Sequence, residues 1–353
     1  MSRLRDATVG HRRRRIRVGL GALTAQTVGG TAAESGRALD ALVRHAVTAE
    51  KSGFDSVWLS EHHFAEDGHL PSPLVVMGAL ARETTAVDLA TNVAIGPLYD
   101  PLRLAEDVAV VDQLSGGRVI LGLGLGYRPE EFAALGVDRS RRGRILETTV
   151  CTLRAAWSGE AVVTDGRTGH AVPVRPLPAQ TGGPPILLGA FASRGVRRAA
   201  RIADGWIAPD LASVAQLARR LEILELTELG RPFHVALTMC AFTAASGAWE
   251  AVAPGHFLVG DRYRRWMAQA GDGAVPDGPG TNVPVSTRPD HVVAGTPEEC
   301  VDQLRPWWEL LRALPQTVSA HVTVRVVFPG VDDAATRESI RLLGTDVFPA
   351  LAE

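Results

Sequence analysis

The chain has 353 residues, 46% of them hydrophobic, and its formal net charge at pH 7 is −2. This balance argues against nucleic acid or an anionic membrane as the main partner, and no apolar stretch approaches the roughly 18 residues of a membrane-spanning helix. The three cysteines, Cys151, Cys240 and Cys300, form no CxxC pair, so neither a disulfide framework nor a zinc site is expected. Because the N-terminus also lacks a signal-peptide pattern, we expect a cytoplasmic protein.

Short apolar segments alternate along the chain with segments of helical periodicity. Residues 1–15, which contain an arginine run at 12–15, are expected to form a flexible N-terminal arm. The predicted strands span residues 16–23, 54–64, 87–95, 118–126, 186–191, 204–209, 233–242 and 318–328. The predicted helices span residues 36–52, 73–83, 101–114, 139–157, 193–203, 214–229 and 332–343. This alternation indicates parallel βαβ units.

Eight strands alternating with helices predict an α/β fold, the (β/α)8 TIM barrel, because eight such units close on themselves. We expect a single domain over residues 16–353, with insertions at the C-terminal mouth of the barrel. Residues 158–185 form a polar excursion that is rich in Pro and Gly. Residues 271–291 are rich in Gly, Pro, Asp and Thr, and a loop of that length is expected to be mobile and is a candidate lid.

The second predicted strand ends with a carboxylate and two histidines, Glu61, His62 and His63. Reactive groups of a barrel lie at the carboxyl ends of its strands, so these side chains are expected at the mouth. One alternative is a metal site, but adjacent histidines point in different directions, and no HExxH or HxH spacing completes a metal-ligand set. A purely structural histidine pair is a second alternative. We favour a third, in which a neutral imidazole bonds a cofactor or relays a proton.

Small residues and a helix start follow the fourth and fifth predicted strands. Gly122, Gly124 and Gly126 lie within a strand and its end, so we interpret them as clearing space for a flat ring rather than as a dinucleotide fingerprint. Residues 192–195 open a helix directly after a strand, where backbone amides can bind a phosphate. An ordinary βα turn is the alternative reading of that segment.

Four segments of the chain resemble the luciferase-like flavin monooxygenase family, in that family's order and over nearly the whole chain. They are VWLSEHHFAEDGHLPSP (57–73), YDPLRLAEDVAVVDQLSGGRVILGLGLGYRPEEFAALGVD (99–138), ASRGVRRAARIADGW (192–206) and GTPEECVDQL (295–304). The AED…D.LSGGR block in the second segment is the most specific part of the resemblance.

The resemblance implies a barrel, usually dimeric, that uses reduced FMN or a deazaflavin at its C-terminal mouth. A separate flavin reductase commonly supplies the reduced flavin. In the family, reduced FMN reacts with O2 to give a flavin hydroperoxide, which oxygenates a small organic substrate. The protein is then expected to bind the flavin, exclude water and place the substrate.

The resemblance also implies which residues form the site. His62, with His63 beside it, is the expected catalytic acid–base group near the flavin. Asn92 and Val93 match a strand end where the family often carries a non-proline cis peptide against the ring. The other expected cofactor-binding residues are Gly124, Tyr127 and Arg128 after the fourth strand, and Ala192, Ser193, Arg194 and Gly195 in the phosphate-binding turn.

Two positions depart from the family pattern. Leu125 stands where many FMN-using members carry an arginine that holds phosphate, so Arg128, Arg142 or Arg194 would have to replace it. Gly124 lies near the position of the reactive cysteine of the luciferases, so light emission is not expected. A deazaflavin-dependent hydride-transfer enzyme is therefore an alternative, and a non-catalytic flavin-binding homologue is a third.

Overall fold

The computed structural model describes residues 16–163, 171–209, 211, 213–226, 228–271 and 287–352. The arm expected at residues 1–15, and residues 272–286 of the expected mobile loop, lie outside the described residues. Within the described ranges, no helix combines the length and the apolar character needed to cross a membrane.

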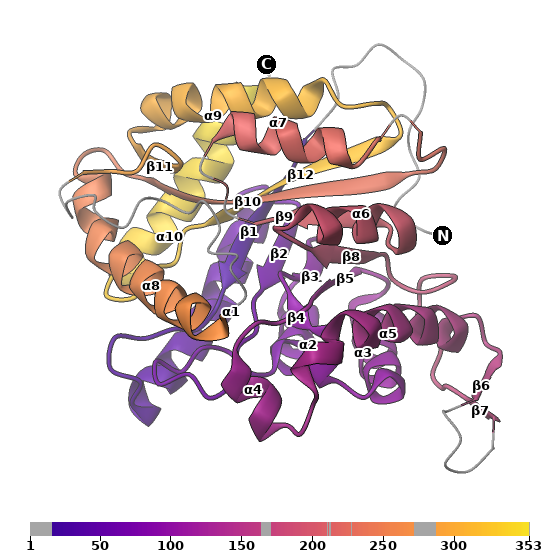
Figure 1. Ribbon diagram of the computed structural model, residues 1–353. Helices are drawn as coiled ribbons and strands as arrows, with labels where there is room; N and C mark the ends of the chain where they lie inside the picture. The colour runs from indigo at the N-terminus through magenta and orange to yellow at the C-terminus, as the bar shows by residue number, and fades with distance from the viewer. Residues whose placement is uncertain are drawn as a thin grey trace.

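Eight parallel strands close into a barrel surrounded by helices, as the sequence predicted (Figure 1). The strands are β1 (Arg17–Leu23), β2 (Ser56–Leu59), β3 (Asp88–Thr91), β5 (Val119–Gly124), β8 (Ile186–Gly189), β9 (Gly205–Ala208), β10 (Phe233–Thr243) and β12 (Val318–Arg325). Strand β12 pairs with β1 on one side and with β10 on the other, which closes the ring. A short strand β4 (Ala94–Ile95) continues along β5, and β11 (Val292–Gly295) pairs with β10 outside the ring.

The helices lie between successive strands along the chain or, for α10 and α11, after the last strand, and most of them pack on the outside of the barrel. They are α1 (Ala32–Lys51), α2 (Pro73–Glu83), α3 (Pro101–Ser115), α4 (Pro129–Ala134), α5 (Arg142–Trp157), α6 (Ser193–Ile202), α7 (Val214–Ile223), α8 (Ala248–Ala270), α9 (Pro297–Arg312), α10 (Asp333–Leu342) and α11 (Phe348–Ala352). Short helical turns lie at Gly96–Leu98, Arg139–Arg141 and Leu343–Val347, and β6 (Ala161–Val163) pairs antiparallel with β7 (Ala171–Pro173) in the polar excursion.

Local capping explains where several helices begin. The side chain of Thr31 accepts from the N–H of Glu34, and the Glu34 carboxylate accepts from the N–H of Thr31. This capping box starts α1 at Ala32, four residues before the predicted start. Asp100 caps α3 ahead of Pro101, as expected for a proline in the first turn.

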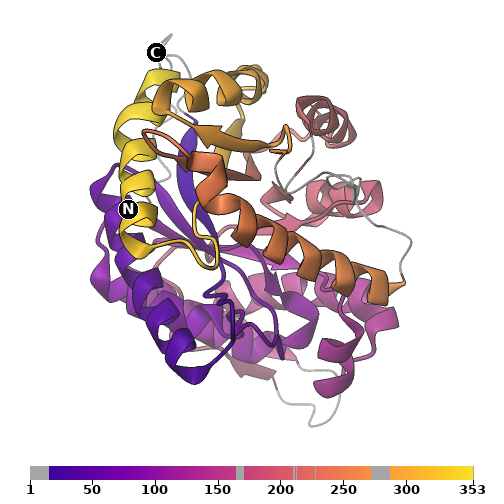
Figure 2. The ribbon, with the colours of Figure 1, turned by 90° about the vertical axis from the view of Figure 1, so that its left-hand side faces the viewer.

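The region between β10 and β12 contains elements that the sequence analysis did not predict. Helix α8 crosses one end of the barrel (Figure 2), and β11 and α9 follow it. Proline or glycine at 254, 255 and 260 interrupts the helical pattern of α8. Gly255 is required by packing, since a Cβ there would lie 2.9 Å from the Cβ of Phe328.

Arg118, at the start of β5, joins α2, α3 and the barrel. Its guanidinium donates to the carbonyl oxygens of Ala81 (3.0 Å), Thr84 (2.9 Å), Val87 (2.6 Å) and Ser115 (2.7 Å), and to the Thr84 hydroxyl (3.0 Å). Arg118 is buried, at 7% exposure. The SGGR block therefore has a structural role here, because its arginine satisfies the carbonyl groups at the ends of two helices.

The interior of the barrel is a packed core rather than a pore. Its apolar layer is formed by Trp58, Ala90, Ile120, Leu187, Ile207 and Ala236. Above this layer, the Asn92 side chain donates to the hydroxyl of Thr238 at 2.8 Å. The carboxyl ends of the strands thus stand on a filled floor, and reactive groups can lie only in the loops above it.

Candidate active site

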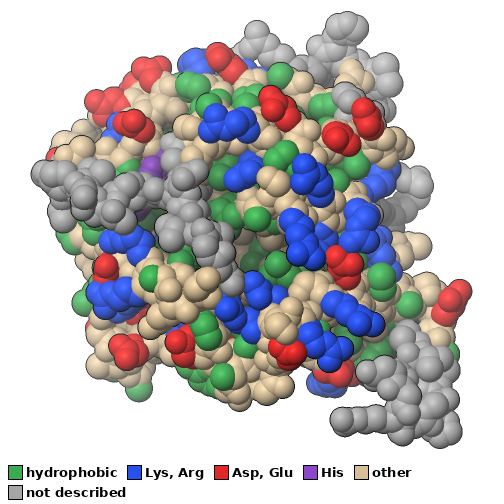
Figure 3. Space-filling view, in the orientation of Figure 1, with side chains coloured by type: hydrophobic (Ala, Val, Ile, Leu, Met, Phe, Trp, Pro, Cys, Tyr) green, Lys and Arg blue, Asp and Glu red, His purple; other side chains and the backbone are tan. Residues whose placement is uncertain are grey.

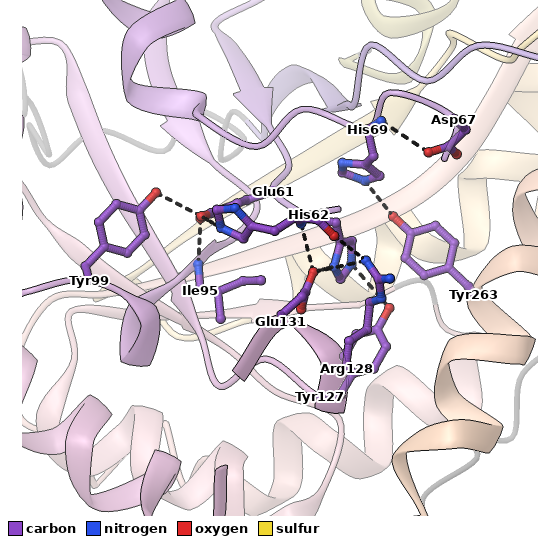
Figure 4. A network of polar contacts seen from close by, with 11 residues as sticks. Glu61, His62, Asp67, His69, Ile95, Tyr99, Tyr127, Arg128, Glu131 and Tyr263 are labelled. Carbon is purple, nitrogen blue, oxygen red and sulfur yellow. Dashed lines mark hydrogen bonds and ion pairs between the residues drawn. The ribbon is translucent and has the colours of Figure 1, made fainter. Parts of the chain in front are cut away.

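His62 lies in the loop after β2, at the centre of a network of polar contacts (Figure 4). The second strand is shorter than predicted and ends at Leu59, which places His62 in the loop. Its Nδ1 atom lies 2.9 Å from Oε1 of Glu131 in α4, and its Nε2 atom lies 3.2 Å from the hydroxyl of Tyr127. Both ring nitrogens of this buried histidine are therefore engaged by the segment after β5.

Glu131 is fully buried and ionised. Its Oε1 atom also accepts from the backbone N–H of His63 (2.9 Å) and from Arg128 (3.3 Å). Burial alone would raise the pKa of Glu131, but the hydrogen bonds from His62 and His63 and the charge of Arg128 outweigh it and lower that pKa. The carboxylate therefore fixes the proton of His62 on Nδ1 and leaves Nε2 as the acceptor for Tyr127. The second oxygen, Oε2, is buried and has no hydrogen-bond partner among the described residues.

Tyr127 stays protonated in this environment. Burial, together with the nearby Tyr263 and Glu131, raises the pKa of its hydroxyl well above the ordinary value. The tyrosine is nonetheless partly exposed, whereas His62 and Glu131 are buried. Its hydroxyl can thus donate a hydrogen bond over the whole physiological pH range.

Helix α8 places two aromatic rings against His62. The ring centroid of Trp266 lies 4.9 Å from that of His62, and the centroid of Tyr263 lies 5.7 Å away. The guanidinium of Arg128 stacks on Trp266 at 4.3 Å, a cation–π contact. On another side, the ring of His69 lies 4.9 Å from His62. His62 is therefore enclosed by rings as well as held by hydrogen bonds.

His63 points away from its neighbour, as expected for adjacent histidines. Its Nε2 atom lies 2.7 Å from Oε1 of Glu61, and this hydrogen bond raises the pKa of His63. Glu61 also accepts from the hydroxyl of Tyr99 (3.0 Å) and from the N–H of Ile95 (2.8 Å). In the part of the chain that the structure describes, no group of three or more His, Cys, Asp or Glu side chains is arranged to hold a metal ion.

The glycines of β5 make room for the chain itself. The peptide between Asn92 and Val93 is cis. A Cβ on Gly124 would clash with the side chain of Val93, and a Cβ on Gly122 would clash with the carbonyl oxygen of Thr91. The space above these glycines is thus filled by the end of β3 and the residues after it. This differs from the prediction that the glycines leave room directly for a flat ring.

The N-terminus of α6 is basic and lacks a side-chain cap. Ala192 occupies the N-cap position without a capping hydrogen bond, so the first N–H groups of the helix, near Ser193 and Arg194, are open to an anion. Arg220 of α7 donates to the Ser193 hydroxyl at 3.3 Å. Figure 3 shows arginine side chains gathered over α6, beside a hollow in the middle of this face.

The structure brings some of the predicted site residues together and separates others. His62, Tyr127 and Arg128 meet in one network, in which Glu131 contacts both His62 and Arg128. The sequence analysis did not predict Glu131, although the acidic pair that follows Pro129 was an available signal. It also missed Tyr263 and Trp266, because no periodicity predicted α8. Arg142, which was a candidate to replace the missing phosphate-binding arginine, donates to the carbonyl oxygen of Arg139 at 3.0 Å.

Comparison with known proteins gives the following matches. The family model described as luciferase-like monooxygenase matches residues 16–313. The F420-dependent hydroxymycolic acid dehydrogenase of Mycobacterium tuberculosis is 34% identical over 177 residues, which are 48% of this chain and 49% of that protein. The matched segments cover 49–64% of the length of such curated relatives.

Two solved structures share the fold over nearly their whole length. Monooxygenase RslO1 from Streptomyces bottropensis superposes with a TM-score of 0.78 and 21% identity, covering 95% of this chain and 99% of that one. The oxygenating constituent of 3,6-diketocamphane monooxygenase from Pseudomonas putida, in complex with FMN, superposes with a TM-score of 0.74 and 19% identity. This match covers 95% of this chain and 98% of that one. At these identities the likeness is one of fold.

Proposed function

The chain belongs to the luciferase-like monooxygenase family, and we propose that it is a flavin-dependent monooxygenase that uses reduced FMN and O2 to oxygenate a small organic substrate. The observation that carries this proposal is the Tyr127–His62–Glu131 network at the mouth of the barrel. It is a buried acid–base device, supported on one side by an ion pair with Arg128. A separate flavin reductase would supply the reduced cofactor.

The residues present fit a flavin phosphate. The uncapped start of α6, with Ser193, Arg194 and the nearby Arg220, offers backbone N–H groups and positive charge to an anion. When bound, reduced FMN supplies the electrons that activate O2. The chain would hold the cofactor through the phosphate turn formed by Ala192, Ser193, Arg194 and Gly195, and Asn92, Val93, Tyr127 and Arg128 would face its ring.

A deazaflavin-dependent hydride-transfer enzyme is the second candidate. Leu125, in place of an arginine, packs against the hydrophobic core and leaves one fewer positive charge for the phosphate monoester of FMN. The F420-dependent relative is also 34% identical over the matched segment. A non-catalytic flavin-binding homologue is disfavoured because His62 keeps a partner on each ring nitrogen.

Anaerobic titration with reduced FMN, and separately with reduced F420, tests the proposal. We expect reduced FMN to bind more tightly and, once air is admitted, to give a transient absorbance that belongs to neither reduced nor oxidised FMN. Arg194→Ala should weaken FMN binding roughly 10- to 100-fold, as expected for a charge-assisted hydrogen bond. Arg37→Ala, on the exposed face of α1, removes the same charge elsewhere and should change little. Preferential binding of F420 without a transient would favour hydride transfer, and binding of neither would contradict both candidates.

We also propose that the protein is a homodimer that associates through the surface around Phe64. Phe64 is 61% exposed and adopts a left-handed backbone conformation (φ 53°), which is uncommon for a bulky residue. Beside it lies a hollow of about 430 Å³, lined in part by Leu39 and Val75, which are also exposed. A protruding ring next to an apolar hollow suits a two-fold contact, in which the Phe64 ring of each copy enters the hollow of the other copy.

Phe64→Glu should convert the dimer to a monomer. The substitution acts twice in a two-fold interface and buries a charge in an apolar hollow, so the dissociation constant should rise at least about 100-fold. Sedimentation equilibrium measures this, with Val110→Glu, another exposed apolar position (44%) on α3, as the comparison. A Phe64→Glu variant that sediments like the wild type would exclude this surface.

A further inference from the structure

We infer that the hydroxyl of Tyr127 is the group that exchanges a proton with the bound reactants, and that His62 acts through it as a positioning residue. This inference rests on the proposed function, because it assigns a role within the same site. It differs from the sequence-based expectation, in which His62 itself faces the flavin and Tyr127 only contacts the cofactor.

His62 has no ring nitrogen left for a ligand. Its Nδ1 atom is bonded to Glu131 at 2.9 Å and its Nε2 atom to Tyr127 at 3.2 Å. The rings of His69, Tyr263 and Trp266 surround it, and only 6% of the residue is exposed. A reactant could meet this imidazole directly only if Tyr127 or α8 moved away.

The order of Tyr127, His62 and Glu131 determines which way a proton moves between them. The Glu131 carboxylate is held by His62, by the N–H of His63 and by Arg128, so it keeps the proton of His62 on Nδ1. The lone pair of Nε2 then faces the hydroxyl of Tyr127. A hydroxyl, an imidazole and a buried carboxylate in this order form the arrangement by which proteins activate an O–H group.

Tyr127 is the most exposed of the three hydrogen-bonded residues, and contacts of its backbone hold it in place. Arg139 donates to its carbonyl oxygen at 3.1 Å. The preceding Gly126 has a left-handed backbone (φ 68°), and a Cβ there would clash with the side chain of Ile95. The backbone that carries the Tyr127 ring is therefore held on both sides, and the hydroxyl is held by His62.

The transfer itself balances without a redox change. When a reactant X–H gives its proton to the Tyr127 oxygen, the original Tyr127 proton moves to Nε2 of His62. The tyrosine is a neutral phenol before and after the step. The products are X⁻ and an imidazolium whose charge Glu131 neutralises, and the reverse sequence delivers a proton to X⁻.

Tyr127→Phe tests the inference, with Tyr263→Phe as the matched variant. Tyr263 also packs on His62, but its hydroxyl lies 3.2 Å from Nε2 of His69. In the cofactor-free protein, ¹⁵N NMR should show His62 protonated on Nδ1. Loss of the Tyr127 hydroxyl should shift the Nε2 resonance of His62, and loss of the Tyr263 hydroxyl should shift it far less.

The second readout is the reoxidation of bound reduced FMN in air, followed as a function of pH. Tyr127→Phe should slow it about 100- to 1,000-fold, within the usual contribution of a positioned acid–base group, and should change the shape of its pH profile. The Kd for reduced FMN should stay within about threefold. Tyr263→Phe should have an effect at least tenfold smaller.

The possible outcomes distinguish a failure of the Tyr127 inference from a failure of the proposed function. If the wild type binds reduced FMN and Tyr127→Phe reoxidises it at the wild-type rate, the inference is overturned and the proposed function stands. If Tyr127→Phe leaves the Nε2 resonance of His62 unchanged, the hydrogen bond on which the inference depends is absent. If the wild type binds neither reduced FMN nor reduced F420, both proposals fail.

Discussion

Replacing Arg118 by methionine is expected to lower the free energy of unfolding by about 3–5 kcal/mol. The guanidinium satisfies carbonyl oxygens of Ala81, Thr84, Val87 and Ser115, and methionine would leave these groups buried without a donor. Each orphaned group costs about 1–3 kcal/mol, offset in part by the apolar surface that methionine buries. Chemical denaturation measures the loss, and the melting temperature should fall by roughly 5–10 °C.

Two further variants show whether the geometry or the charge of Arg118 matters. Arg118→Lys keeps the charge but cannot donate in a planar fork, so it should recover less than half of the stability. Arg82→Met removes an exposed arginine at the end of α2 and should change the unfolding free energy by no more than about 0.5 kcal/mol. A loss below about 1 kcal/mol in Arg118→Met would mean that water replaces the guanidinium and that the SGGR block does not stabilise this barrel.

Replacing Glu131 by glutamine is expected to reduce turnover about 1,000-fold while the Kd for reduced FMN stays within about threefold. Glutamine keeps the shape of the side chain but cannot act as an anion toward Nδ1 of His62, so the tautomer that faces Tyr127 is no longer fixed. Substitutions that release a catalytic histidine from its carboxylate lower rates by up to about 10⁴. Glu130→Gln, at the exposed neighbouring position, is the matched control and should keep the wild-type rate.

The same variant should change the response of the protein to acid. Burial raises the pKa of Glu131, but the hydrogen bonds and charges around it lower that pKa below the ordinary value of 4.5. A carboxyl group whose pKa is lower in the folded state stabilises the protein fully above pH 4.5, and this contribution is lost as the pH falls through the folded value. Thermal melts from pH 7 to pH 3 should therefore show a steeper acid loss in the wild type than in Glu131→Gln. Parallel curves would contradict the ionised state assigned to Glu131.

The strands of the barrel could be predicted from the sequence, whereas part of its mouth could not. Apolar runs bounded by glycine and proline predicted all eight strands, because a strand that is buried on both faces has apolar residues at consecutive positions. The capping box at Thr31 and Glu34 was also present in the sequence, and it would have placed the start of α1 correctly. Signals of this kind depend only on neighbouring residues.

Helix α8 and the environment of His62 depend on contacts between distant segments. Residues such as Pro254 and Gly255 weaken the local helical pattern, so α8 forms because tertiary packing outweighs propensity. The sequence suggested that His62 lies at the mouth. It could not show that Glu131, 69 residues away along the chain, takes one nitrogen and Tyr127 the other. Likewise, the glycines of β5 indicated a close approach, but only the fold identified Val93 as the group that approaches Gly124.

The proton-transfer groups come from only two of the eight loops at the mouth, those after β2 and β5. Tyr127, Arg128 and Glu131 lie within a single five-residue stretch, while the described residues of the loops after β9, β10 and β12 contribute none of the hydrogen bonds to His62. A change of side chain in the described parts of the loops after β9 or β12 would therefore remove none of these hydrogen bonds, so those loops could differ in shape around a substrate while the acid–base network keeps its partners.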